Sequence, residues 1–198
     1  MPGPPSKIMI IRHGEKPSSP PGNGPFDITL NGNPGGGKSL IVQGWQRAGA
    51  LNGFFAPYKS NPPQHIAKPN YIYAANPNSE SQRPFETVTP LAAWLGYNQG
   101  TQQGSQFNVS YSIGSGEADL VKSVLALEGV VLICWEHDHI MPDIIDHIRK
   151  AIPISNHKSM PSKWPDVFYL VWVLNLHNGK EPSYEWHSVN QNLLHGDM

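Results

Sequence analysis

The chain has 198 residues, of which 38% are hydrophobic and 15% charged, and its formal net charge is −1 at pH 7. A chain of this length forms one domain with its own core, and a charge near zero provides no overall field for nucleic acid or anionic membranes. Its single cysteine, Cys134, excludes an internal disulfide, and no apolar run approaches the roughly 20 residues of a membrane span. We therefore expect one cytoplasmic domain over residues 1–198, without nucleic-acid or membrane partners.

The first half of the chain alternates apolar runs with stretches rich in glycine and proline. KIMIIR (7–12) is short and β-branched and predicts a buried strand, and the Gly/Pro-rich stretch after it predicts a long loop. Apolar residues at helical spacing predict a helix over 39–55 with Ser39 as its N-cap. NYIYAAN (70–76) then predicts a second buried strand, and SESQRPFETVTPLAAWLG (79–96) predicts a helix that its last glycine ends.

The second half continues the same alternation. The predicted elements are a loop at 99–106, a short strand at 107–112, a helix at 116–127, a strand at 129–135, a helix at 143–152, and a hairpin of 165–176 with 182–189. Strands that alternate with helices favour right-handed crossovers and a parallel sheet. The sequence thus predicts a three-layer α/β/α domain, with a mostly parallel central sheet and helices on both faces.

Polar groups suited to phosphate follow three of the predicted strands. Arg12 and His13 follow the first strand, Arg83 lies just past the second, and His137 follows VVLICWE. Ligands of such sheets bind at the carboxyl ends of the strands, so we expect these side chains to converge. A neutral imidazole can attack phosphorus while guanidinium groups bind the phosphate oxygens in pairs. The pattern favours phosphoryl transfer on a small phosphorylated substrate.

These residues lie in a segment, IRHGEKP, that resembles the R-H-G signature of the histidine phosphatase superfamily, whose members have the phosphoglycerate mutase-like fold. Further segments that resemble the family follow in its order: GWQRAGAL, AANPNSESQRPFETVTPLA, VLICWEHDHI and WPDVFYLVWVL. The resemblance implies that His13 is a nucleophile that forms a phosphohistidine, with Arg12, Arg83 and His137 completing the phosphate pocket. It implies hydrolysis of a phosphomonoester without a metal or a cofactor, and a phosphoglycerate-mutase-like transfer is the alternative within the family.

The residues after the nucleophile have less certain roles in this resemblance. Gly14 would keep the backbone tight beside His13. Glu15 and Lys16 could contact the substrate or could be ordinary loop charges. Arg47, in the GWQRAGAL segment, is expected to tie its helix to neighbouring loops.

An alkoxide leaves poorly, so a carboxylic acid should protonate the bridging oxygen. In one branch of the family the aspartate directly after the second histidine does this, which points to Asp138. Glu136 also adjoins that histidine, but strand alternation would turn it away if the strand continues so far. Glu15 and Glu86 are further candidates.

Three other interpretations compete with the phosphatase. GNPGGGKS (32–39) matches the P-loop pattern but lacks a strong preceding strand, so we expect a flexible connection there. His137, His139, Asp143 and His147 are suitable metal ligands, although their spacing matches no recurrent zinc pattern, and we expect no metal site. A fold of this family could also bind phosphorylated ligands without catalysis.

Overall fold

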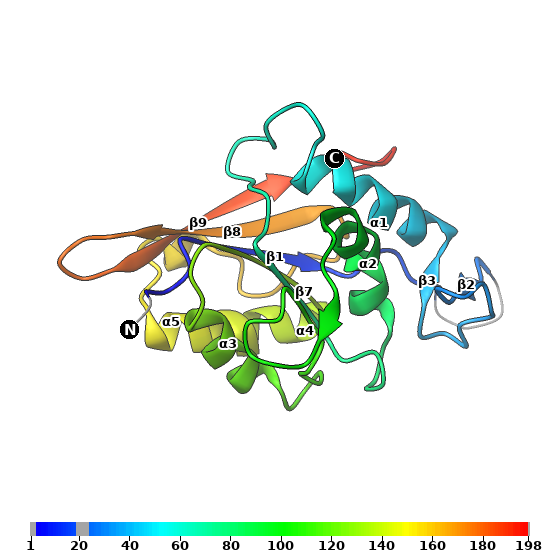
Figure 1. The fold of residues 1–198 in the computed structure, drawn as a ribbon, viewed down its shortest axis with the longest axis horizontal. Helices are drawn as coiled ribbons and strands as arrows, with labels where there is room; N and C mark the ends of the chain where they lie inside the picture. Colours follow the sequence, from blue (N-terminus) through cyan, green and yellow to red (C-terminus); the bar gives the residue numbers. More distant parts are fainter. Residues whose placement is uncertain (1–2, 19–23, 198) are drawn as a thin grey trace.

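Figure 1 shows the computed structural model, which describes residues 3–18 and 24–197. A seven-stranded sheet has the order β5-β6-β4-β7-β1-β8-β9. Its strands are β1 (Lys7–Arg12), β4 (Tyr71–Ala74), β5 (Gln99–Gly100), β6 (Phe107–Asn108), β7 (Val130–Trp135), β8 (Leu170–His177) and β9 (Ser183–Asn190). The pairings from β5 to β1 are parallel, whereas β8 runs antiparallel to both β1 and β9. The predicted, mostly parallel sheet is confirmed.

Helices cover both faces of this sheet (Figure 1). The helices are α1 (Val42–Phe55), α2 (Arg83–Leu95), α3 (Glu117–Leu125), α4 (His137–His139) and α5 (Asp146–Ala151), with a π-helical turn at Ile140–Ile145 and a 3₁₀ turn at His157–Ser159. Alternate residues of β1 point to opposite faces: Ile8 and Ile10 pack toward α3 and α5, and Met9 and Ile11 toward α1 and α2. The three-layer arrangement is therefore present.

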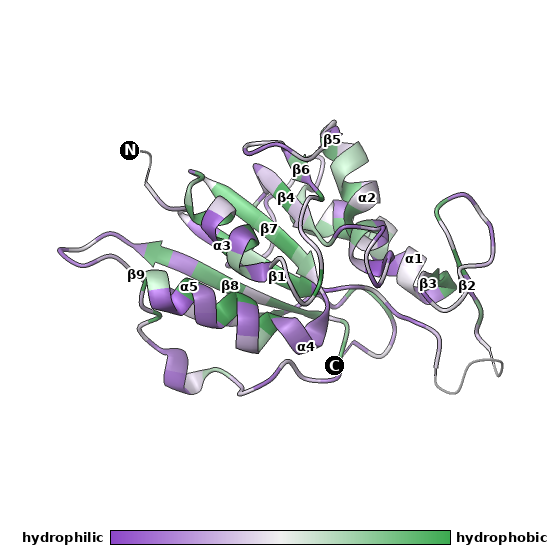
Figure 2. Cartoon of the chain, turned by 90° about the horizontal axis from the view of Figure 1, so that it is seen from below, coloured by the Kyte–Doolittle hydropathy of each residue, from purple (hydrophilic) through white to green (hydrophobic). Residues whose placement is uncertain are grey.

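The hydropathy of the chain follows these layers. Figure 2 shows hydrophobic residues along β7 and β8 in the middle of the sheet and hydrophilic residues on the outer turns of the helices. All side chains of β7 from Val131 to Trp135 are fully buried, as expected for a central strand covered on both faces. None of the helices in the described part of the chain is long and apolar enough to cross a bilayer.

Several predicted boundaries differ from the structure. Ser39 is not a helix N-cap: it is buried just before a short strand β3 (Leu40–Ile41), and α1 begins at Val42. The helix predicted from residue 143 belongs to a longer helical stretch that starts at His137. Part of the predicted 99–106 loop pairs as strand β5.

The long loop after β1 has some regular structure of its own. In it β2 (Asp27–Ile28) pairs antiparallel with β3, and residues 19–23 lie outside the described part. Four of its described glycines have positive φ, at 54° for Gly24, 79° for Gly32, 62° for Gly36 and 83° for Gly37, which glycine adopts without strain. The end of the loop meets the start of α2, where the backbone N–H of Gln82 donates to the Lys38 carbonyl at 3.0 Å.

Candidate active site

The sheet brings His13 and Glu136 together by its register. β1 and β7 are parallel neighbours in which Arg12 pairs with Trp135, so the residues that follow each strand lie side by side. The backbone N–H of His13 donates to the Trp135 carbonyl at 3.1 Å and extends this alignment by one residue. The carboxyl ends of both strands therefore present a histidine and a glutamate to the same space.

The ring of His13 is completely buried and held in one orientation. Its Nδ1 lies 2.7 Å from the carbonyl oxygen of Gly14. A carbonyl only accepts, so Nδ1 carries the proton and Nε2 has a free lone pair. Burial lowers the pKa of His13 well below its ordinary value, and the charges of Arg12, Arg83 and Lys16 act in the same direction. The imidazole is neutral at physiological pH, which is the nucleophilic form.

Arg12 is buried beside this ring and held by two contacts. Its Nη1 donates to Oδ1 of Asp166 at 2.8 Å, and its Cζ lies 4.1 Å from the centre of the Phe168 ring. The hydrogen bond from Arg12, together with its charge, lowers the pKa of Asp166. Phe168 also packs against His13, with ring centroids 5.9 Å apart. Neither Asp166 nor Phe168 was expected from the sequence, because both come from the segment before β8, far along the chain.

Glu136 and His137 follow β7, at the start of α4. Glu136 is the N-cap of that helix, and its Oε2 accepts from the backbone N–H of Asp138 at 2.8 Å. Its Oε1 lies 2.5 Å from Nδ1 of His137, a contact that lacks hydrogen-bond geometry and is an ion pair when the histidine is protonated. Because β7 ends at Trp135, strand alternation does not reach Glu136, and it faces the site.

Asp138 has a different setting. Its side chain is 78% exposed, and its Oδ1 lies 3.5 Å from Nε2 of His137. Glu136 is only 19% exposed and has a carboxylate oxygen within 4.8 Å of a ring nitrogen of His13. Of the two carboxylates beside the second histidine, Glu136 is the one enclosed with the nucleophile.

Arg83 begins α2 and has its guanidinium next to the loop after β2. Its Nε donates to the Ser39 carbonyl at 3.3 Å, and its Nη2 donates to the Gly37 carbonyl. The charge of Arg83 acts on His13, so the guanidinium lies near the nucleophile as well as the loop. The same helix reaches the nucleophile through Thr87, whose hydroxyl accepts from the backbone N–H of Gly14 at 2.8 Å.

Gly14 and Gly44 permit the close approach of this segment to α1. A Cβ on Gly14 would lie 3.1 Å from the Gly44 carbonyl oxygen, and one on Gly44 would lie 2.6 Å from the Glu15 carbonyl oxygen. Larger side chains at either position would push the nucleophile segment away from the helix.

Glu15 is engaged with Arg47 of α1. The Arg47 Nη2 donates to Glu15 at 2.6 Å and to Asp197 at 2.7 Å, and Nη1 donates to Gln191 at 2.9 Å. All four side chains are buried. This network attaches α1 and the segment after β9 to the nucleophile segment, and it occupies Glu15 with a partner other than substrate.

Lys16 is half-buried, and its charge acts on both His13 and Asp166.

In the segment that matches the P-loop pattern, the backbone amides bind the carboxylate of Asp27. The carboxylate of Asp27 accepts from the backbone N–H of Gly37 at 3.1 Å and of Ser39 at 2.8 Å. A Cβ on Gly35 would lie 2.3 Å from the same carboxylate. The backbone amides that a P-loop would direct at a nucleotide are taken by Asp27, and Lys38 is exposed.

The other proposed metal ligands are also engaged. His139 Nδ1 donates to Oδ2 of Asp143 at 2.7 Å, and His147 Nδ1 donates to the Asp143 carbonyl at 2.6 Å. These residues do not form a group of converging ligands in the described part of the chain.

The buried carboxylate of Glu86, whose pKa burial raises, accepts from the backbone N–H of Leu40 at 3.0 Å and so holds β3.

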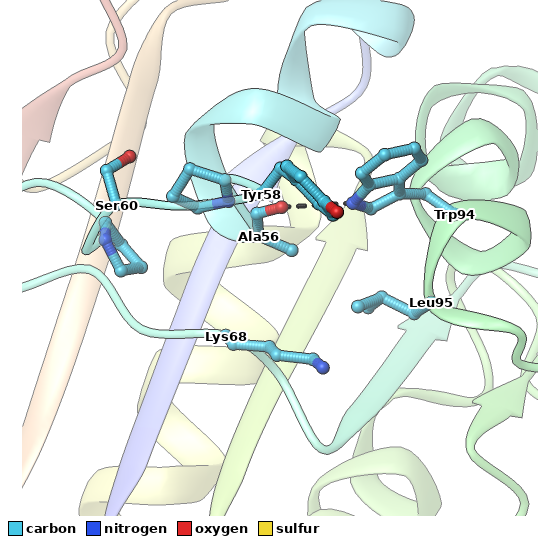
Figure 3. A pocket seen from close by; sticks show the side chains of 8 residues that line it. Ala56, Tyr58, Ser60, Lys68, Trp94 and Leu95 are labelled. Atoms are coloured by element: carbon cyan, nitrogen blue, oxygen red, sulfur yellow. Dashed lines mark hydrogen bonds between the residues drawn. The ribbon is translucent and has the colours of Figure 1, made fainter.

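A separate pocket of about 430 Å³ lies at the far end of α1 (Figure 3). Tyr58, Lys68 and Trp94 line it, and the Trp94 indole N–H donates to the Ala56 carbonyl at 3.0 Å. Since Ala56 ends α1 and Gly14 contacts its first turn, this pocket is distinct from the space around His13.

No family model and no curated protein matches this sequence. Among solved structures, the Agrobacterium tumefaciens protein named as phosphohistidine phosphatase SixA is similar over 94% of this chain and 97% of that one, at 16% identity and a TM-score of 0.49. A mycobacterial glucosyl-3-phosphoglycerate phosphatase with inorganic phosphate covers 94% and 97% at 13% identity, with a TM-score of 0.44. An ecdysone phosphate phosphatase from Bombix mori with tungstate covers 93% and 92% at 12% identity, with a TM-score of 0.43. The sequence identities and the TM-scores are all low, so any function has to be argued from the side chains of the site.

Proposed function

We propose that this protein is a phosphomonoester hydrolase of the histidine phosphatase superfamily, in which His13 accepts the phosphoryl group without the help of a metal. One observation carries the proposal: Nε2 of His13 and Nε of Arg12 are buried without a hydrogen-bond partner among the described residues. Buried polar atoms are almost always paired, so two unpaired ones on adjacent residues suit a site that binds a polar ligand. One of them is a donor and the other a nucleophile, which suits a phosphoryl group.

In the first step, Nε2 of His13 attacks phosphorus and the bond from phosphorus to the ester oxygen breaks. The imidazole gains positive charge as the new bond forms, and the hydrogen bond from Nδ1 to the Gly14 carbonyl stabilises that charge. Arg12 and Arg83 bind the non-bridging oxygens and neutralise their charge. Phe168 and Asp166 keep Arg12 in place.

We assign protonation of the leaving oxygen to Glu136 because it is enclosed with His13, whereas Asp138 is exposed. The alcohol leaves with the Glu136 proton, and the carboxylate then accepts a proton from water as that water attacks the phosphohistidine. Phosphate departs, the P–N bond breaks, and His13 regains its lone pair. His137 donates to the phosphoryl oxygens in both steps.

The alcohol portion of the substrate has an apolar neighbour. A hollow of about 550 Å³ in the loop after β1 is lined by Pro17, Phe26, Ile28 and Pro34. Gly37 also lines it, and its carbonyl accepts from Arg83, so the hollow adjoins the proposed phosphate pocket. We infer that phosphate esters of apolar or aromatic alcohols are preferred to sugar phosphates.

A panel of alkyl, aryl and sugar phosphates, assayed with and without a chelator, tests the proposal. Phosphate should be released in large excess over enzyme in both conditions, and His13→Asn should remove this release. A mutase would rearrange a phosphorylated sugar acid without net release. Binding of phosphate without any turnover would leave only a non-catalytic role.

A further inference from the structure

Three potential metal ligands converge in the candidate active site. His13, Glu136 and His137 each have a ligand atom within 4.8 Å of the other two, and they are the only such group in residues 3–18 and 24–197. One ligand follows β1 and the other two follow β7, so the register of two central strands fixes their spacing.

The donor set and its surroundings suit a divalent metal of borderline softness. Two imidazole nitrogens and one carboxylate oxygen, with a fourth position open to water, are the ligands of many zinc sites. Ligand atoms on tetrahedral zinc lie about 3.4 Å apart, so small side-chain adjustments bring these three into range. Histidine ligands usually donate their other N–H to a fixed acceptor. His13 does so, with Nδ1 on the Gly14 carbonyl and Nε2 buried and unpartnered.

Of the two nearby arginines, Arg12 is neutralised in part by a carboxylate, whereas Arg83 keeps its charge. Arg12 is paired with Asp166 at 2.8 Å, and the Arg83 guanidinium donates to the carbonyls of Gly37 and Ser39. Glu136 itself lies in the field of Arg83. A divalent ion would give a common partner to Glu136 and His137, whose 2.5 Å contact lacks hydrogen-bond geometry.

We propose that Zn²⁺ or a similar divalent ion binds His13, Glu136 and His137 and thereby inhibits the enzyme reversibly. The bound ion would occupy the lone pair of Nε2 that attacks phosphorus. The inhibitory consequence rests on the proposed function, whereas the binding does not. The site differs from the His139, Asp143 and His147 set, in which His139 is bonded to the Asp143 carboxylate and His147 to the Asp143 backbone carbonyl.

Direct binding tests the site without any reference to activity. Metal-stripped protein is titrated with Co²⁺, followed by its visible absorption, and with Zn²⁺ by calorimetry. We expect one equivalent to bind, and Glu136→Gln or His13→Asn to weaken binding by about 10²-fold or more. Asp143→Asn is the matched control and should bind as the parent does. His177 and Glu185 lie 3.0 Å apart on the surface and offer a second pair of ligand atoms. The titrations are repeated with His177→Asn, which removes that pair and should leave the one equivalent bound.

Activity supplies the second measurement. Zn²⁺ should inhibit phosphate release by the parent protein, and a chelator should restore it fully. No saturable binding up to about 1 mM Zn²⁺, unchanged binding in Glu136→Gln and His13→Asn, or activation by Zn²⁺ would each overturn the proposal. Metal binding by a protein that hydrolyses nothing would reject the phosphatase and keep the site. Hydrolysis without metal binding would reject the metal site and keep the phosphatase.

Discussion

The Nδ1 atom of His13 donates to the carbonyl oxygen of Gly14 at 2.7 Å, which fixes the tautomer of the ring. Without this bond either nitrogen could carry the proton, and the tautomer with its proton on Nε2 has no lone pair there to attack phosphorus. The acceptor is a backbone atom of the next residue, so the chain itself supplies the orientation that other sites obtain from a carboxylate.

The first prediction concerns this nucleophile. His13→Ala should reduce phosphate release by about 10⁴-fold or more, because no other group of the site can form the P–N bond. A brief incubation with radiolabelled substrate should give an acid-labile, alkali-stable label on His13 in the parent protein. His147→Ala is the matched control, since its Nδ1 also donates to a backbone carbonyl, at 2.6 Å, outside the site. Activity that survives in His13→Ala would disprove the mechanism.

The second prediction is a pH dependence of stability. Burial, followed by the nearby arginines, lowers the pKa of His13 well below its ordinary value. Between that lowered pKa and about 6.5, the unfolded chain binds more protons than the folded chain, so stability falls as the pH drops. His13→Asn removes this penalty. Urea unfolding at about pH 5 and about pH 7.5 should show a smaller loss on acidification in the variant than in the parent.

His139 provides a control of opposite sign. Burial alone would lower its pKa, but the bond with Asp143 and the charge of Glu117 raise the pKa overall. The protonated His139 ring therefore contributes to the free energy of unfolding in full below about pH 6.5. This contribution is lost as the pH rises through the raised pKa of the folded state. His139→Asn should therefore destabilise the protein more at acidic than at alkaline pH. The same sign for both variants would contradict the electrostatic account.

The third prediction separates the two candidate acids. Glu136→Gln should slow hydrolysis of alkyl phosphates by about 10²–10⁴-fold, the usual range of general acid catalysis. Nitrophenyl phosphate should be slowed much less in the first step, because nitrophenolate leaves without a proton. Asp138→Asn should change both rates little, since its side chain is 78% exposed. A large, selective effect of Asp138→Asn would return the role to that residue.

The central strands and the order of the elements could be predicted from the sequence, because local chemistry determines them. IMII of β1 and all of VVLICW are apolar and rich in β-branched residues, which suits strands that are buried on both faces. The convergence of Arg12, His13 and His137 follows from the rule that parallel strands end at one edge. These features need no knowledge of distant partners.

What could not be predicted depends on distant contacts or on a one-residue boundary. Glu136 faces the site only because β7 stops at Trp135 and α4 starts at His137. Asp166 reaches Arg12 across 154 residues of sequence. Neither relation has a local signal.

The fourth prediction tests the loop that resembles a P-loop. Asp27 accepts two backbone hydrogen bonds there, and charge-assisted bonds contribute about 1.5–3 kcal/mol each. Asp27→Asn should lower the free energy of unfolding by about 1–3 kcal/mol and raise KM, because Arg83 donates to the same loop. Lys38→Ala should leave turnover unchanged. Nucleotide binding by the parent that is lost in Lys38→Ala would restore the P-loop interpretation.

The last prediction concerns the buried network around Arg47. Its guanidinium is 2% exposed and bridges Glu15 and Asp197, so removing it leaves two carboxylates without their cation. Arg47→Ala should lower the free energy of unfolding by about 3–5 kcal/mol, the usual cost of breaking a buried ion pair. Arg149→Ala is the control: Arg149 also contacts a carboxylate, that of Asp146 at 2.9 Å, but its side chain is 41% exposed, so this pair should contribute about 0–1 kcal/mol. Urea titrations of both variants give the comparison. Equal losses would mean that the network stabilises the fold no more than a surface pair does, and that Glu15 is free for another role.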